Sequence, residues 1–175
     1  MAIDYERREY KRGDVIFSEG DRAAEAYLIQ AGKVHLFRDQ NGVAQELDTI
    51  GEGHIFGEMG VISDMNRMAS ADAVNNVTLI CCHRQELKRR LDDLDKDRRE
   101  AMRFLIVYCQ EYLPFEMMEN RPTNKITAER DALALQLIRH FDRPGEIESL
   151  DTFMAGLYRV LIGYAKRRIP PDLDV

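Results

Sequence analysis

The most informative stretch of the sequence is Phe56-Gly-Glu-Met-Gly-Val-Ile-Ser-Asp-Met-Asn-Arg-Met-Ala-Ser-Ala71. Its pattern predicts the end of a strand, a glycine turn, a short apolar helical turn, and an arginine just before the next strand. Gly57 allows the backbone to come close to a ligand. A helix that begins there points free N–H groups outward, and these groups together with the helix dipole favour an anion, typically a phosphate.

Two charged residues in this stretch extend the prediction. Arg67 carries a planar, permanently charged fork that suits two phosphate oxygens. Glu58 is unexpected beside a phosphate unless it accepts hydrogen bonds from neutral groups such as sugar hydroxyls. Together the two side chains indicate a site for the sugar and phosphate of a nucleotide. The alternative is an ordinary β-turn with a surface glutamate and a surface arginine.

The flanking sequence predicts short strands. Eight of the eleven glycines fall between Gly13 and Gly60, whereas all five prolines lie at or after Pro114. Short strands separated by such turn signals are typical of an antiparallel sandwich or barrel. Asn75-Asn76 suits a tight turn because asparagine tolerates positive φ. The predicted strands cover residues 15–17, 26–29, 34–37, 46–50, 69–74 and 77–82.

The second half of the chain predicts helices. Residues 85–113 contain no glycine or proline, and apolar residues recur there at steps of three and four. A polar segment that starts at Pro114 indicates a linker over 114–124. Two more helices are predicted over 126–141 and 150–168, with Ser149 as the N-cap of the last. The expected organisation is a domain over 1–113, this linker, and a C-terminal helical pair over 125–175.

The order and spacing of residues 56–71, here called the cassette, resemble the phosphate-binding cassette of the cyclic nucleotide-binding domain family. That family includes the bacterial catabolite activator protein and the regulatory subunits of cAMP-dependent protein kinase. The matching residues are Phe56-Gly57-Glu58, the apolar turn Met59-Gly60-Val61, then Arg67, Ala69 and Ser70. The resemblance covers about residues 5–113. It implies a mixed α+β fold: an antiparallel β-roll, or jelly-roll-like double-stranded barrel, with flanking hinge or lid helices, ahead of the C-terminal helical segment.

The resemblance also implies roles for individual residues. Arg67 would pair with the cyclic phosphate, and Glu58 would accept from the ribose 2′-hydroxyl. Backbone N–H groups of Gly57, Met68 and Ala69 would help to hold ribose and phosphate. An apolar residue from the helix beyond Leu94 would cover the purine. The expected ligand-binding residues are Phe56, Gly57, Glu58, Met59, Arg67, Met68, Ala69 and Ser70, and the candidates for the residue that covers the base are Phe104, Leu105 and Tyr108.

Two cassette positions depart from the family pattern. Asn66 stands where many members have proline, which leaves the charge pattern intact. Met68 follows the arginine where the family has a small residue. In the family a threonine there is associated with a cGMP preference, and methionine offers no hydroxyl. We therefore expect cAMP to be preferred over cGMP, with a degenerate pocket that takes no nucleotide as the alternative.

The expected function is a regulatory sensor in which nucleotide binding moves residues 85–113 and changes how the C-terminal helices pack. One alternative is a DNA-binding transcription regulator of the catabolite-activator type, and another is an interaction module without nucleotide. DNA is less favoured because the net charge is −6 and the cluster Lys166-Arg-Arg168 lies where a helix dipole favours cations. An unidentified protein partner is expected. The apolar residues 102–112 could be buried in a homodimer interface or by the C-terminal helices of the same chain, and the two explanations are equally good.

Other classes of protein are not supported. The apolar run 104–109 is far short of the ~20 residues of a membrane helix, and the N-terminus is charged where a signal peptide is apolar. A cytoplasmic protein without a membrane association is expected. The histidines at 35, 54, 83 and 140 have no catalytic partner at a motif spacing, so no enzyme is expected. The cysteines at 81, 82 and 109 lack metal-ligand spacing, so we expect buried thiols, no metal and no cofactor.

Overall fold

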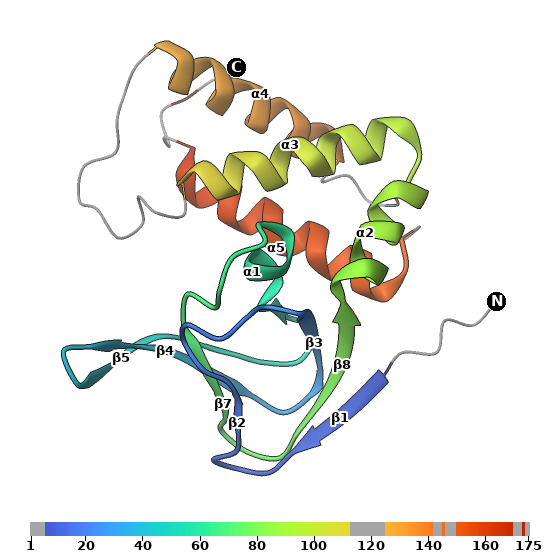
Figure 1. Cartoon of the computed structure of the whole chain (residues 1–175). Helices are drawn as coiled ribbons and strands as arrows, with labels where there is room; N and C mark the ends of the chain where they lie inside the picture. Colours follow the sequence, from blue (N-terminus) through green and yellow to red (C-terminus); the bar gives the residue numbers. More distant parts are fainter. Residues whose placement is uncertain (1–5, 113–124, 142–144, 146–149, 170–172, 174–175) are drawn as a thin grey trace. The chain divides into compact units, whose positions relative to one another are not determined.

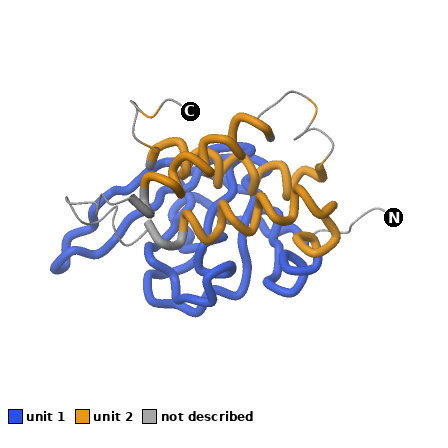
Figure 2. The backbone as a smooth tube through the Cα atoms, turned by 90° about the horizontal axis from the view of Figure 1, so that it is seen from above, with its two compact units in different colours: residues 1–89 blue, residues 90–175 orange. Residues whose placement is uncertain are grey.

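The computed structural model describes residues 6–112, 125–141, 145, 150–169 and 173, and Figure 1 shows its helices and strands. The chain divides into two compact units, Met1–Arg89 and Arg90–Val175 (Figure 2). The predicted domain boundaries at 113 and 125 stay predictions, and the predicted linker 114–124 lies outside the described residues.

The described part of the first unit consists mainly of strands. They are β1 (Glu6–Tyr10), β2 (Val15–Phe17), β3 (Glu25–Ala31), β4 (Val34–Gln40), β5 (Val43–Ile50), β6 (Ile55–Phe56), β7 (Ser70–Ala73) and β8 (Val77–His83). One short helix, α1 (Glu58–Ile62), lies between β6 and β7. Each strand predicted from the sequence is therefore present, with bounds that differ by a few residues.

The strands pair in two four-stranded sheets, in the orders β1-β8-β3-β6 and β2-β7-β4-β5. Every pairing is antiparallel. The buried apolar cluster draws side chains from both sheets, including Tyr27 of β3, Val34 of β4, Ala71 of β7 and Leu79 of β8. The core thus lies between two sheets, which confirms the predicted antiparallel β-roll with helices.

The predicted turn at Asn75-Asn76 is present, and it forms without the positive φ that asparagine tolerates. Among the described non-glycine residues, positive φ occurs at Asn41 and Asp64. The side chain of Asn75 instead accepts a hydrogen bond from the Lys33 N–H at 2.8 Å. A side-chain acceptor therefore shapes this turn, which carries the chain from β7 in one sheet to β8 in the other.

One strand, β1, was not predicted, whereas β6 confirms the strand end that was predicted at Phe56. β1 reads Glu-Arg-Arg-Glu-Tyr and lacks the alternation of apolar and polar residues that identifies a half-buried strand. It forms at the sheet edge by pairing with β8 over Glu6↔Cys81 to Tyr10↔Val77. Pairing with a residue far away in the sequence leaves no local signal, which is why sequence analysis missed it.

The helices are α2 (Arg84–Asp93), α3 (Lys96–Tyr112), α4 (Lys125–Phe141) and α5 (Thr152–Arg168). The predicted helical segment 85–113 is thus split between Asp93 and Lys96. Asp95 stabilises the start of α3, because its Oδ1 accepts from the Arg98 N–H at 3.0 Å. In the second unit, α3, α4 and α5 contact one another.

The predicted N-cap of the last helix is wrong. Asp151, and not Ser149, caps α5, since its side chain accepts from the backbone N–H groups of Phe153 and Met154. Both residue types are good caps, so the sequence alone could not choose between them. The helix therefore starts at Thr152.

The structure also bears on the expectations for the cysteines and for membrane-spanning helices. Cys81, Cys82 and Cys109 are buried thiols, as predicted. Burial raises the pKa of the Cys81 thiol to about 12. None of the described helices has both the length and the apolar character needed to cross a bilayer.

Candidate functional site

Arg67 is a buried cation held by neutral groups. Its residue is 5% exposed, and its Nη1 and Nη2 donate to the carbonyl oxygens of Gly57 and Glu25, each at 2.6 Å. The guanidinium carbon lies 4.1 Å from the centre of the Phe17 ring and 5.5 Å from that of Tyr27. Its buried Nε has no hydrogen-bond partner among the described residues. Burial lowers the pKa of Arg67, because the charged form loses its hydration.

Gly57 and Glu58 lie at the start of α1, in the first half of the cassette. Gly57 caps α1 with a left-handed backbone at φ 72°, and Glu58 is the first residue of that helix. Glu58 is 2% exposed. The structure therefore brings a buried carboxylate, a left-handed glycine and a buried guanidinium into one segment. The alternative of a plain turn with a surface glutamate and arginine is excluded, because both side chains are buried.

The lack of a side chain at Gly57 makes room for Arg67. A Cβ built there would lie 2.6 Å from Arg67 Nη1 and 3.3 Å from Phe17 Cε1. Gly60 is similarly constrained, since a Cβ there would lie 2.6 Å from the Cβ of Ala23. Glycine is thus required at both positions for packing, and at Gly57 for conformation as well.

Replacing Gly57 with alanine is expected to lower the free energy of unfolding by more than the ~1–2 kcal/mol that a left-handed alanine costs, because the new Cβ also displaces Arg67. Gly42→Ala is the matched control: Gly42 has φ +82°, and a Cβ there meets nothing within 4 Å. Urea unfolding of both variants separates the contact from the backbone strain. Equal losses for the two variants would show that Arg67 does not need this space.

The remaining cassette residues are fixed by neighbouring segments. The Arg67 N–H donates to the Asp21 carbonyl at 2.8 Å, and the Arg67 carbonyl accepts from the Gly20 N–H at 2.9 Å. Arg38 Nε donates to the Met68 carbonyl at 2.5 Å. Ser70 Oγ accepts from the Glu19 N–H at 2.9 Å. Phe56 and Met59 are 3% and 5% exposed, while Met68, Ala69 and Ser70 are half-buried.

The candidates for the base cover lie in the second unit, on α3. Leu105 and Tyr108 are fully buried, and the Tyr108 hydroxyl donates to Asp131 of α4 at 2.5 Å. Phe104 is half-buried, and its ring stacks on Tyr108 with the ring centres 6.0 Å apart. Of the three, Phe104 keeps the most accessible side chain.

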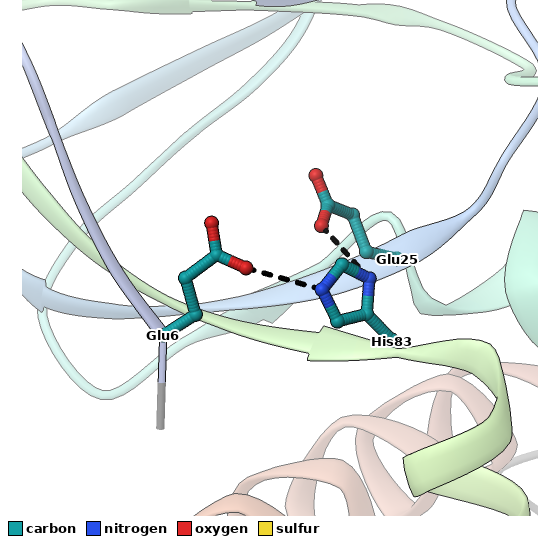
Figure 3. A group of neighbouring side chains, drawn as sticks. All are labelled: Glu6, Glu25 and His83. Carbon is teal, nitrogen blue, oxygen red and sulfur yellow. Dashed lines mark hydrogen bonds and ion pairs between the residues drawn. The ribbon is translucent and has the colours of Figure 1, made fainter. Parts of the chain in front are cut away.

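Sequence analysis missed one group of charged residues in the first unit. His83 Nε2 lies 3.1 Å from Glu6 Oε2, and His83 Nδ1 lies 3.3 Å from Glu25 Oε2 (Figure 3). Arg8 donates to both carboxylates, and the Tyr27 hydroxyl donates to Glu25 at 2.8 Å. Glu6, Glu25 and His83 are residues of types that can ligate a metal. The Arg8 contacts explain the cluster instead as a network that fastens β1 to β3 across β8. Burial and the Glu25 contact together raise the pKa of Tyr27.

Several residues in contact with Arg67 also carried no sequence signal. Phe17 and Tyr27, whose rings lie beside the guanidinium, belong to β2 and β3, far from the cassette in sequence. Glu25 contributes a backbone carbonyl, which any residue type could supply. No residue pattern could have identified these contacts.

Comparison with protein families agrees with this geometry. Residues 7–93 match the family model described as the cyclic nucleotide-binding domain. The chain belongs to this family. The matched residues include β1 from Arg7 onward, the other seven strands, the cassette and α2.

Two curated relatives show how far the similarity extends. The cyclic AMP receptor protein of Thermus thermophilus is 40% identical over 96 residues, which are 52% of this chain and 44% of the relative. The cAMP-dependent protein kinase regulatory subunit of Candida albicans is 30% identical over 82 residues, 47% of this chain and 17% of the relative. The chain thus spans less than half the length of either protein.

A solved structure is also similar. The EAL enzyme Bd1971 in its halfsite-occupied form has a TM-score of 0.58 and 32% identity, covering 63% of this chain and 99% of that one. Its cAMP-bound form has a TM-score of 0.53 and its cGMP-bound form 0.55, both with 27% identity and 77% of this chain covered. The chain covers 33% and 34% of those two longer chains.

Proposed function

We propose that this chain binds a cyclic nucleotide at the cassette, prefers cAMP over cGMP, and acts as a regulatory sensor. The burial of Arg67 against two neutral carbonyls is the main support. A desolvated guanidinium with neutral acceptors is stabilised by a phosphate, whose charged oxygens make stronger hydrogen bonds than carbonyls. The family of the chain and the cAMP-related names of its relatives support the same ligand class.

Each of the expected ligand-binding residues in the cassette has a role in this proposal. Arg67 pairs with the cyclic phosphate, and Glu58 accepts from the ribose 2′-hydroxyl. Backbone N–H groups of Gly57, Met68 and Ala69 complete the contacts to ribose and phosphate. Phe56 and Met59 anchor the turn in the core, and the Ser70 hydroxyl fixes the strand that leaves it. Phe104, Leu105 and Tyr108 of α3 stay the three candidates for the residue that covers the base.

The preference for cAMP rests on Met68, which has no hydroxyl to offer a guanine. The solved neighbour does not discriminate, since Bd1971 has both a cAMP-bound and a cGMP-bound form. Calorimetric titration of the purified chain with each nucleotide at physiological salt tests the proposal. Micromolar or tighter binding of cAMP, with weaker binding of cGMP, is expected. A folded protein that gives no heat with either nucleotide would indicate a degenerate pocket.

Glu58→Gln is expected to weaken cAMP binding because a carboxylate accepts the 2′-hydroxyl more strongly than an amide does. A loss of roughly tenfold corresponds to one charge-assisted hydrogen bond of about 1.5 kcal/mol. The matched measurement uses 2′-deoxy-cAMP, which lacks the hydroxyl and should bind the variant and the parent equally. If the variant weakened both ligands alike, Glu58 would act on the fold of the cassette instead.

We also propose that binding is transmitted by helical movement and that the chain itself is not an enzyme. Relatives named as receptor and regulatory subunits support this, although the solved neighbour Bd1971 is an EAL enzyme of which this chain matches a part. Incubation with cAMP followed by mass spectrometry is expected to show intact nucleotide. Conversion to AMP would contradict the proposal.

Direct DNA binding is the less favoured alternative. Of the C-terminal cations, the guanidinium of Arg167 lies 4.9 Å from the Tyr164 ring centre on α5. Such a cation–π contact is an ordinary role for a cation at a helix end. Titration of a labelled duplex at low salt is expected to show no specific complex, whereas an affinity that falls steeply with salt would favour a DNA-binding regulator.

A further inference from the structure

Three consecutive backbone carbonyls are held by two arginines: those of Ala23 and Ala24, just before β3, and that of Glu25, its first residue. The Glu25 carbonyl accepts from Arg67 Nη2 at 2.6 Å. The Ala23 carbonyl accepts from Arg84 Nη2 at 2.7 Å, and the Ala24 carbonyl accepts from the Arg84 backbone N–H at 3.0 Å. Arg84 is the first residue of α2. The cassette arginine and the beginning of α2 are therefore bonded to adjacent peptide groups.

Arg84 also contacts the cassette directly. Its Nη1 donates to the carboxylate of Asp64, in the loop between α1 and Arg67. This contact holds the pKa of Asp64 below its usual range. The Asp64 side chain is 77% exposed, so the pair contributes little to stability. Its importance is geometric, because Arg84 thereby contacts both segments that position Arg67.

The same helix is fixed again near its other end. Arg90 Nη1 donates to Asp151 Oδ1 at 2.9 Å, and the Arg90 side chain is 3% exposed. The same Asp151 oxygen accepts from the N–H groups of Phe153 and Met154, so it is the N-cap of α5. Because an α-helix is a hydrogen-bonded rod, a displacement of Arg84 is carried along α2 to Arg90.

We infer that Arg84 is a positioning residue that couples the cassette to α2, and that Arg90 and Asp151 pass the change to the start of α5. The inference rests on the proposed nucleotide binding. A bound phosphate offers Arg67 charged acceptors that compete with the Glu25 carbonyl for its N–H donors. A change at this peptide group acts on the neighbouring carbonyls that Arg84 holds. Such differential contacts are what allow a ligand to shift a conformational equilibrium.

The test is hydrogen exchange of the full chain with and without saturating cAMP, in the parent, in Arg84→Gln and in Arg89→Gln. Arg89 is the matched control, because it is an arginine of the same helix whose side chain pairs with Glu86 at the surface. In the parent and the control, cAMP is expected to change exchange in the cassette, in α2 and in the first turns of α5. In Arg84→Gln the cassette change remains and the α5 change is lost.

The outcomes are distinguishable. A cassette response in the parent with no α5 response, or an α5 response that survives in Arg84→Gln, overturns the coupling alone. No response anywhere in the parent, together with no heat on titration, overturns the proposed nucleotide binding and the coupling with it. Should Arg84→Gln fail to fold, Asp64→Asn removes the charged partner and leaves both backbone contacts of Arg84 in place. A reduced α5 response in that variant supports the coupling, and an undiminished one overturns it.

Discussion

Arg67→Ala is expected to weaken cAMP binding by more than tenfold. A charge-assisted hydrogen bond contributes about 1.5–3 kcal/mol, and the planar fork of Arg67 can make two of them to one phosphate. The effect is large because Arg67 is 5% exposed, so water screens its attraction to a phosphate only weakly. Calorimetric titration with cAMP measures the loss. Arg67→Lys is expected to fall between the parent and alanine, since it keeps the charge without the fork.

Two controls make this result specific to the site. Arg22 forms an isolated antiparallel β-bridge with Asn66, the residue before Arg67, and Arg22 is exposed. Because the bridge is made by the backbone, Arg22→Ala should leave cAMP binding unchanged. Thermal unfolding of Arg67→Ala checks the fold, because the variant leaves the Gly57 and Glu25 carbonyls without their donors. A folded Arg67→Ala that binds cAMP as tightly as the parent would remove Arg67 from the site.

Much of the β-roll and the cassette could be predicted because their signals are local. Glycines mark the turns, short β-prone runs lie between them, and the cassette pattern Phe56-Gly57-Glu58 followed by Arg67 is contiguous in the sequence. Gly57 shows why such a signal is reliable. Its positive φ and the nearby Arg67 both exclude a side chain, so the structure admits glycine there and little else.

The parts that could not be predicted depend on contacts between distant residues. β1 forms by pairing with β8, and the charged side chains of its sequence indicate no strand. The surroundings of Arg67 are equally non-local, since the Phe17 ring and the Glu25 carbonyl come from other strands. Arg84 directly precedes the predicted helical segment 85–113, and no sequence motif includes it. Its role between β3 and Asp64 becomes visible once the strands are placed.

Asp151→Ala is expected to destabilise the chain by about 2–4 kcal/mol. The loss of an N-cap costs about 1 kcal/mol, and removal of one partner of a buried ion pair costs about 3–5 kcal/mol. The second contribution is reduced here because Arg90 is 3% exposed while Asp151 is 34% exposed and partly solvated. Urea unfolding followed by circular dichroism measures the change.

Asp151→Asn is the matched variant, because asparagine caps a helix as well as aspartate does and removes the charge alone. It should lose less stability than alanine, and the difference between the two variants gives the contribution of the cap. If both variants unfolded at the same urea concentration as the parent, neither the cap nor the Arg90 pair would stabilise the start of α5, and the connection from α2 to α5 would lose its physical basis.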